Sequence, residues 1–182
     1  MIRDFIRNQL NQDPLTLLDA PVWGLLTNVA EVYEKEKQEC TENLEEVDWK
    51  YDCLESALIE YRCPKCGSGL IDVTTNGTDR ETAVFTCRSC GEQWPFEDLA
   101  PLAISDFFAE ENYRSIRDGG EPVTITCPEC DEDTYILADD VCILCEESTE
   151  RRCQRCGIEI SPVEVDGEGY CSWCAHMMSK DD

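Results

Sequence analysis

The feature that most restricts the fold of this chain is a set of six C-x-x-C pairs. The 182 residues include 14 cysteines, and twelve of these fall into the six pairs. Two residues between cysteines allow a tight turn that directs both sulfurs to one point, and two facing turns supply four thiolates to one tetrahedral metal ion. Taken consecutively, the pairs predict three metal-binding units. The predicted ligands are Cys63, Cys66, Cys87, Cys90, Cys127, Cys130, Cys142, Cys145, Cys153, Cys156, Cys171 and Cys174.

Zinc is the metal that this ligand set favours. Four thiolates complete the tetrahedral shell of Zn²⁺ and leave no position for water, so we predict three structural zinc sites. Iron is a chemically allowed alternative. Two further alternatives are pairing across neighbouring units and a treble-clef variant of the third unit. Inert buried cysteines and a thioredoxin-type redox motif fit less well, because packing does not produce six pairs of one spacing and no βαβ pattern is present.

The stretches between the pairs have the β-prone composition and turn signals of short hairpins. In the first unit, residues 70–74 and 83–86 flank the turn signal Asn76-Gly77. In the second unit the β-prone stretches are 123–126, 134–137 and Val141, and in the third they are 158–160 before a turn at 166–167. Units this small cannot bury a sufficient core, so each metal ion is expected to contribute on the order of 10 kcal/mol to folding.

The motifs CPKCG…CRSCG, CPEC…CILC and CQRCG…CSWC resemble the zinc ribbon (rubredoxin-like) superfamily, in three copies over roughly half of the chain. The resemblance implies a two- or three-stranded sheet clipped by zinc, with the twelve cysteines as ligands. In that pattern glycine follows the second cysteine, where it can take positive φ. The chain departs from the pattern at Asp131, Glu146 and Ala175. The superfamily is functionally broad, so the resemblance implies no particular task.

Residues 1–62 contain no cysteine pair and have helical periodicity. Pro14 and Pro21 are helix-start signals. From Cys40 to Tyr61 the apolar residues recur in alternating steps of four and three, which is heptad spacing. Asn43 followed by Glu46 has the pattern of an N-cap, which predicts a break near residue 42. Two interpretations stay open: a helical hairpin packed on itself or on the first ribbon, and an arm for dimerisation or partner docking.

A second helical segment follows the first ribbon. Leu99, Leu102, Ala103, Phe107 and Tyr113 suggest an amphipathic helix that ends at the glycine pair 119–120. The predicted fold class is therefore a small, metal-stabilised α+β chain, with a helical region before three tandem zinc ribbons and one helix between ribbons 1 and 2. The predicted boundaries are 1–62 for the helical region, 63–96 for ribbon 1, 97–120 for the helix and linker, 121–147 for ribbon 2, 151–176 for ribbon 3 and 177–182 for the tail.

The net charge of −25 restricts the partners of the chain. Residues 121–150 contain ten acidic residues and no lysine or arginine. Nucleic-acid binding requires clustered basic residues that neutralise phosphates. The cluster that meets this requirement is Arg151, Arg152 and Arg155, with Trp173 in the same unit as a surface on which a base could stack. These four are the candidate nucleic-acid contacts.

The leading functional hypothesis is a non-enzymatic, zinc-binding adaptor whose acidic surface docks a basic protein partner. The alternative is nucleic-acid binding by the third ribbon, which the overall charge disfavours. Closed metal shells and a single histidine predict no catalytic residues. No stretch approaches the roughly 20 apolar residues of a membrane span, so we expect a cytoplasmic protein with reduced thiols and no membrane partner. Heptad spacing also allows a helical homo-oligomer.

Overall fold

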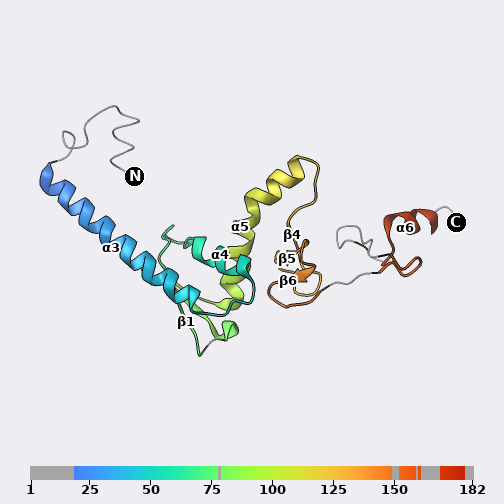
Figure 1. The fold of residues 1–182 in the computed structure, drawn as a ribbon, viewed down its shortest axis with the longest axis horizontal. Coiled ribbons are helices and arrows are strands. Elements are labelled where there is room, and N and C mark those ends of the chain that lie inside the picture. The colour runs from blue at the N-terminus through green and yellow to red at the C-terminus, as the bar shows by residue number, and fades with distance from the viewer. Residues whose placement is uncertain (1–18, 78, 149–151, 159, 161–168, 179–182) are drawn as a thin grey trace.

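The computed structural model describes residues 19–77, 79–148, 152–158, 160 and 169–178. These residues form four α-helices and two antiparallel three-stranded sheets, which confirms the α+β class (Figure 1). In chain order the elements are α3 (Ala20–Glu45), α4 (Asp52–Glu60), β1 (Ile71–Thr74), the 3-10 turn η1 (Arg80–Thr82), β2 (Val84–Cys87), β3 (Gln93–Pro95), α5 (Phe96–Arg117), β4 (Thr124–Ile125), β5 (Tyr135–Ile136), β6 (Val141–Cys142) and α6 (Ser172–Met178). The helix start expected at Pro14 lies outside the described residues.

Helix α3 begins as the sequence predicts but ends later. Pro21 lies in its first turn, where the missing N–H costs no hydrogen bond. The predicted break near residue 42 is wrong, because α3 continues to Glu45. Asn43 does not cap a helix: its Nδ2 donates to Asp72 Oδ1 of β1 over 2.8 Å. The Asn43 side chain therefore makes a tertiary contact instead of the N-cap that the local pattern predicts.

The apolar residues at heptad spacing between Cys40 and Tyr61, called the heptad stripe below, lie mostly inside the molecule. The chain turns after α3 and continues in α4, so one helix does not span residues 40–61. Leu44, Leu54 and Leu58 are nonetheless all buried, in one core with the first sheet and α5. The helical-hairpin interpretation, with the stripe on the first ribbon, therefore describes these residues. They line a core and are not available as a docking face.

Trp49 occupies the centre of this core. Its ring stacks between Phe85 of β2 and Phe96 of α5, with centroid distances of 5.8 and 6.1 Å. Its Nε1 donates to the backbone oxygen of Leu44 over 2.7 Å, which satisfies the one polar group of the side chain. The packing joins the helical region and the first ribbon into one body. No periodicity in the sequence marks Trp49 as a core residue, because it lies in the turn between two helices.

Helix α5 starts directly after β3 and ends before Gly119, which takes a φ of 82° as expected of a C-terminal glycine. The predicted apolar face is partly wrong, since Leu102 is 49% and Tyr113 66% exposed. The buried face consists of Phe96, Leu99, Ala100, Pro101, Ala103, Ile104 and Phe108. The real face is rotated relative to the predicted one because it must cover both α4 and the first sheet.

The two sheets have the same three-stranded antiparallel topology. Ile71 pairs with Cys87 and Phe85 with Trp94 in the first sheet, and Ile125 pairs with Tyr135 in the second. Ile136 and Ile143 of the second unit belong to the main core. The third unit ends in α6, and most of the hairpin predicted before that helix, including 159 and 161–165, lies outside the described residues. The turn expected at 166–167 lies outside the described residues.

Candidate metal centres

The structure brings all twelve paired cysteines together in three groups of four. The sulfurs of each group lie within 4.8 Å of one another. The groups are Cys63, Cys66, Cys87 and Cys90; Cys127, Cys130, Cys142 and Cys145; and Cys153, Cys156, Cys171 and Cys174. Consecutive pairs therefore combine, as predicted, and pairing across units is wrong for this structure. Each group could hold one metal ion.

The sulfur spacing fits a tetrahedral ion. A regular tetrahedron with metal–sulfur bonds of about 2.3 Å has edges of about 3.8 Å. The Sγ–Sγ distances are 3.6 Å for Cys63–Cys90, 3.7 Å for Cys127–Cys145 and 3.8 Å for Cys156–Cys171. They are far longer than a disulfide bond of about 2.05 Å. Soft thiolate donors at this spacing suit a soft or borderline ion such as zinc or iron.

Five of the six C-x-x-C pairs form the same closed turn. In each, the N–H of the residue after the second cysteine donates to the oxygen of the first cysteine, over 2.8–2.9 Å, and the N–H of the first cysteine donates to the carbonyl five residues later. The sixth pair, Cys171 and Cys174, differs because it enters α6. Local backbone hydrogen bonds thus close five of the turns that direct the sulfurs inward.

The positions where glycine is missing take the same backbone conformation as the glycines. Asp131 has a φ of 61° and Glu146 a φ of 62°, close to the 72° of Gly67 and the 74° of Gly91. For a residue with a Cβ this left-handed conformation costs about 1–2 kcal/mol. The turn therefore forms without its glycine, at a local energetic cost that other contacts must offset. Ala175 avoids the cost because it lies in α6.

No family model, curated protein or solved structure matches the chain. The likeness to zinc ribbons therefore depends on the three tetracysteine groups, on the shared turns and on the two small sheets.

The thiols of one group do not ionise alike. In the second group, burial opposes ionisation of Cys142, but the Thr134 hydroxyl and N–H donors outweigh it and lower its pKa to about 7. Burial and the neighbouring sulfurs raise the pKa of Cys145 to about 12. Four adjacent thiolates repel one another, so a cation is required to keep them all deprotonated. The donor set is therefore one that binds a metal ion with release of protons.

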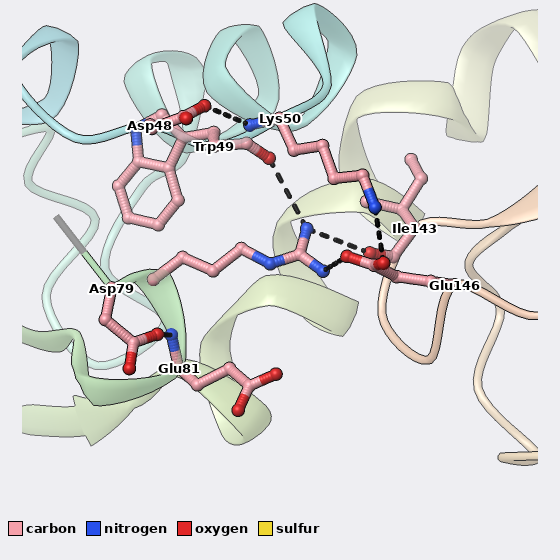
Figure 2. Close-up of polar contacts among 8 residues, drawn as sticks. Asp48, Trp49, Lys50, Asp79, Glu81, Ile143 and Glu146 are labelled. Carbon is pink, nitrogen blue, oxygen red and sulfur yellow. Dashed lines mark hydrogen bonds and ion pairs between the residues drawn. The ribbon is translucent and has the colours of Figure 1, made fainter.

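A buried arginine joins the second tetracysteine unit, residues 121–148, to the main core. No pattern in the sequence predicts this contact. Arg80 is 8% exposed. Its Nη1 donates to the carbonyl oxygens of Trp49 and Ile143 over 3.4 and 3.3 Å, and its Nη2 pairs with Glu146 Oε1 over 2.5 Å. Figure 2 shows these groups converging from three separate segments. Lys50 adds a second ion pair to Glu146.

The guanidinium of Arg80 also lies over an aromatic ring. Its Cζ is 5.7 Å from the centroid of Phe96, which belongs to the same core as Trp49. The arrangement provides a cation–π contact as well as hydrogen bonds. Glu146 directly follows Cys145 of the second group, so the left-handed turn at that position directs its carboxylate towards Arg80. The missing glycine is the only sequence signal that could have drawn attention to this junction.

Three of the four candidate nucleic-acid contacts each directly precede a cysteine of the third group. Arg152 and Arg155 flank Cys153 and are exposed. Trp173 is 65% exposed on α6, next to Cys174. Arg151 lies outside the described residues. The metal group therefore anchors two of the basic side chains and the aromatic one on the same small unit.

The two cysteines outside the C-x-x-C pairs are packing residues. Cys40 is buried in α3, and burial raises the pKa of its thiol to about 11. Cys53 is half-buried in α4, and burial raises its pKa as well. Both thiols are thus protonated at neutral pH and poor nucleophiles.

Within the described part of the chain, no helix combines the length and the apolar character needed to cross a bilayer.

Proposed function

We propose that the protein is a non-enzymatic adaptor in which three zinc ions hold small modules together and an acidic surface docks a basic protein partner. Zinc is proposed because each group gathers four sulfurs, and Sγ–Sγ distances of 3.6–3.8 Å match the edge length of a zinc–thiolate tetrahedron. A full shell of sulfurs leaves no coordination position for a substrate or an activated water. Three such sites would each add a formal charge of −2 and take the chain from −25 to −31.

The observation that carries the docking proposal is the charge around the second metal group. Eight acidic side chains between residues 121 and 148 are exposed, and this segment has no basic residue. They are Glu121, Glu129, Asp131, Glu132, Asp133, Asp139, Glu146 and Glu147. Arg80, together with the buried Ile136 and Ile143, holds the unit against the main core, so its charges have a defined position. A basic protein surface would be attracted to this unit and acidic competitors repelled.

The experiment is copurification from the native host, followed by titration of each identified partner against the zinc-loaded full-length protein. We expect a partner with a basic surface and a binding constant that decreases with salt. A variant with Glu129→Gln, Glu132→Gln and Glu147→Gln should bind more weakly. A control with Glu97→Gln, Asp106→Asn and Glu111→Gln changes three exposed acids elsewhere and alters the net charge equally.

Two outcomes would overturn this assignment. If both variants lose affinity equally, net charge and not the second unit determines binding. If the recovered partners lack basic surfaces, the docking proposal is wrong. Metal analysis of the purified protein tests the zinc component independently, with three equivalents of zinc per chain as the expected result.

The second candidate function is nucleic-acid binding by the third unit. The observation in its favour is that Arg152, Arg155 and Trp173 are all exposed and each directly precedes a cysteine of the third group. Base stacking on an aromatic ring with nearby arginines is a common mode of single-strand binding. It would be supported by RNA or DNA binding that weakens steeply with salt and is lost in Arg152→Glu/Arg155→Glu.

A further inference from the structure

Helix α3 has an apolar face that is buried near its C-terminus and largely exposed towards its N-terminus, although the neighbouring Trp23 is itself buried. Cys40 and Leu44, near its C-terminus, are buried against the first ribbon. Val29 and Val22 lie about three and five helical turns before Cys40, so they continue the same face. Yet Val29 is 59% exposed. In Figure 1 the N-terminal half of α3 extends beyond the other labelled elements.

The exposed part has the pattern of a helix-pairing surface. Val22, Leu25, Val29 and Val32 are separated by steps of three, four and three, which is heptad spacing with β-branched residues at alternate positions. Leu25 is 64% exposed and Leu26 adds to the same patch. We call these five residues the α3 stripe. Five adjacent exposed apolar residues on one helix exceed the scattered apolar residues normal for a surface.

Charge distinguishes among the proteins that could cover the α3 stripe. Residues 20–30 carry no charge, although 30% of the chain is charged. From Glu31 to Glu45 the helix then carries six acids and only Lys35 and Lys37 as bases. A helix that packs on the stripe and extends along α3 would therefore meet an excess of carboxylates. A second copy carries the same net charge of −25 and would be repelled, whereas a basic helix would be attracted.

We propose that the α3 stripe docks an amphipathic helix of a partner protein, with apolar residues at heptad spacing and lysine or arginine along its flanks. The proposal rests on the proposed function, because it takes the basic partner as given and assigns it a second contact. Apolar packing fixes the position of the partner helix, and the acidic half of α3 favours basic flanks. The stripe continues the established contact between α3 and the first ribbon, so docking would extend an existing packed surface.

The test uses the zinc-loaded full-length protein and two synthetic helical peptides of about 21 residues, or three heptads. One peptide has leucine at the heptad core positions and lysine on its flanks. The other has the same charge with serine in place of leucine. We expect the leucine peptide to bind the wild type, measured by calorimetry at about 0.15 M salt, and the serine peptide to bind at least about tenfold more weakly.

The matched variants change the same number of exposed apolar residues on two different helices. Leu25→Gln/Val29→Gln alters the stripe, and Leu102→Gln/Tyr113→Gln alters exposed positions of α5. Neither pair changes the charge. The stripe variant should lose at least about tenfold in affinity for the leucine peptide, and the α5 variant should bind like the wild type. Circular dichroism should show unchanged helix content in both.

Each alternative result has a defined meaning. Equal binding by the wild type and the stripe variant would overturn the stripe as the site but leave docking of basic partners intact. Binding of neither peptide would count against both the stripe and the proposed function. Concentration-dependent dimerisation of the wild type in sedimentation experiments, abolished in the stripe variant, would replace the partner helix with a second copy of the chain and overturn the proposal.

Discussion

Replacing Arg80 with methionine tests whether one buried side chain docks the second metal unit on the main core. Methionine keeps the apolar stem but is shorter than arginine, and it removes the charge, the cation–π contact with Phe96 and every hydrogen bond of the guanidinium. The carbonyl oxygens of Trp49 and Ile143 then lose a donor. Glu146 is affected least, because its carboxylate is partly exposed and regains water.

The expected cost follows from the burial of these groups. A hydrogen bond from a charged donor contributes about 1.5–3 kcal/mol, and a buried acceptor left without a partner costs about 1–3 kcal/mol. The two carbonyl bonds of Arg80 are long, at 3.4 and 3.3 Å, so we place the total in the lower range. We therefore expect Arg80→Met to destabilise docking by about 1.5–3 kcal/mol, or roughly 10- to 150-fold in the equilibrium constant.

The assay is hydrogen exchange, measured by mass spectrometry on the metal-loaded protein. Amides of residues 134–144, which include β5 and β6, should exchange roughly 10- to 150-fold faster, because undocking exposes this sheet. Amides of β1 and β2 should change much less. Arg114→Met is the matched control, since Arg114 forms an exposed ion pair with Glu110 on α5 and contributes little. An increase below about threefold at 134–144, or an equal increase in both sheets, would refute the reasoning.

Five further predictions concern the metal groups and the core. Asp131→Gly should tighten metal binding at the second group about twofold, because glycine adopts the left-handed φ of this position without strain. The gain is small because glycine also raises the conformational entropy of the unfolded chain. Competition with a chromophoric chelator measures the change in metal affinity. Glu146→Gly relieves the same strain but loses both ion pairs, so it should weaken binding instead. Metal affinity should rise between pH 6 and 8, because thiols with a raised pKa, such as Cys145 at about 12, must release a proton on binding; a flat profile would contradict this. Leu54→Ala and Leu58→Ala should each lower the free energy of unfolding by about 2–5 kcal/mol, measured in urea, because both side chains are fully buried. Complete removal of metal should abolish the sheet signal and protease resistance of the C-terminal half, and retention of both would refute the structural role of the sites.

The metal groups are the part of the structure that the sequence predicts best. Ligand spacing within a C-x-x-C pair is a local property, since two intervening residues suffice to bring two sulfurs together. Consecutive pairing follows because short connections close at a lower entropy cost than long ones. The strands around Ile71, Phe85 and Tyr135 were also predictable, because β-prone residues lie between turn signals. The sequence shows that Asp131 and Glu146 stand where the ribbon pattern has glycine, but it does not show that both residues adopt a left-handed φ.

The helical region was predicted less well because its helices are shaped by contacts distant in sequence. Asn43 was assigned to a cap on local pattern alone, whereas its amide bonds to Asp72 in β1. The exposure of Leu102 and Tyr113 reflects where α4 and the first sheet lie, which periodicity does not encode. Trp49 has no periodic signal at all, yet it stacks at the centre of the core.

The sequence by itself determined the twelve cysteine positions, their spacing in six pairs and the strong negative charge. These properties depend on neighbouring residues and on composition. Only the tertiary structure decided that the heptad stripe is core, that the apolar face of α3 is largely exposed towards its N-terminus, and that Arg80 reaches Glu146. The physical reason is that burial depends on what packs against a side chain. Arg80 and Glu146 lie 66 residues apart in the chain and meet only because two separately formed turns dock on the same aromatic core.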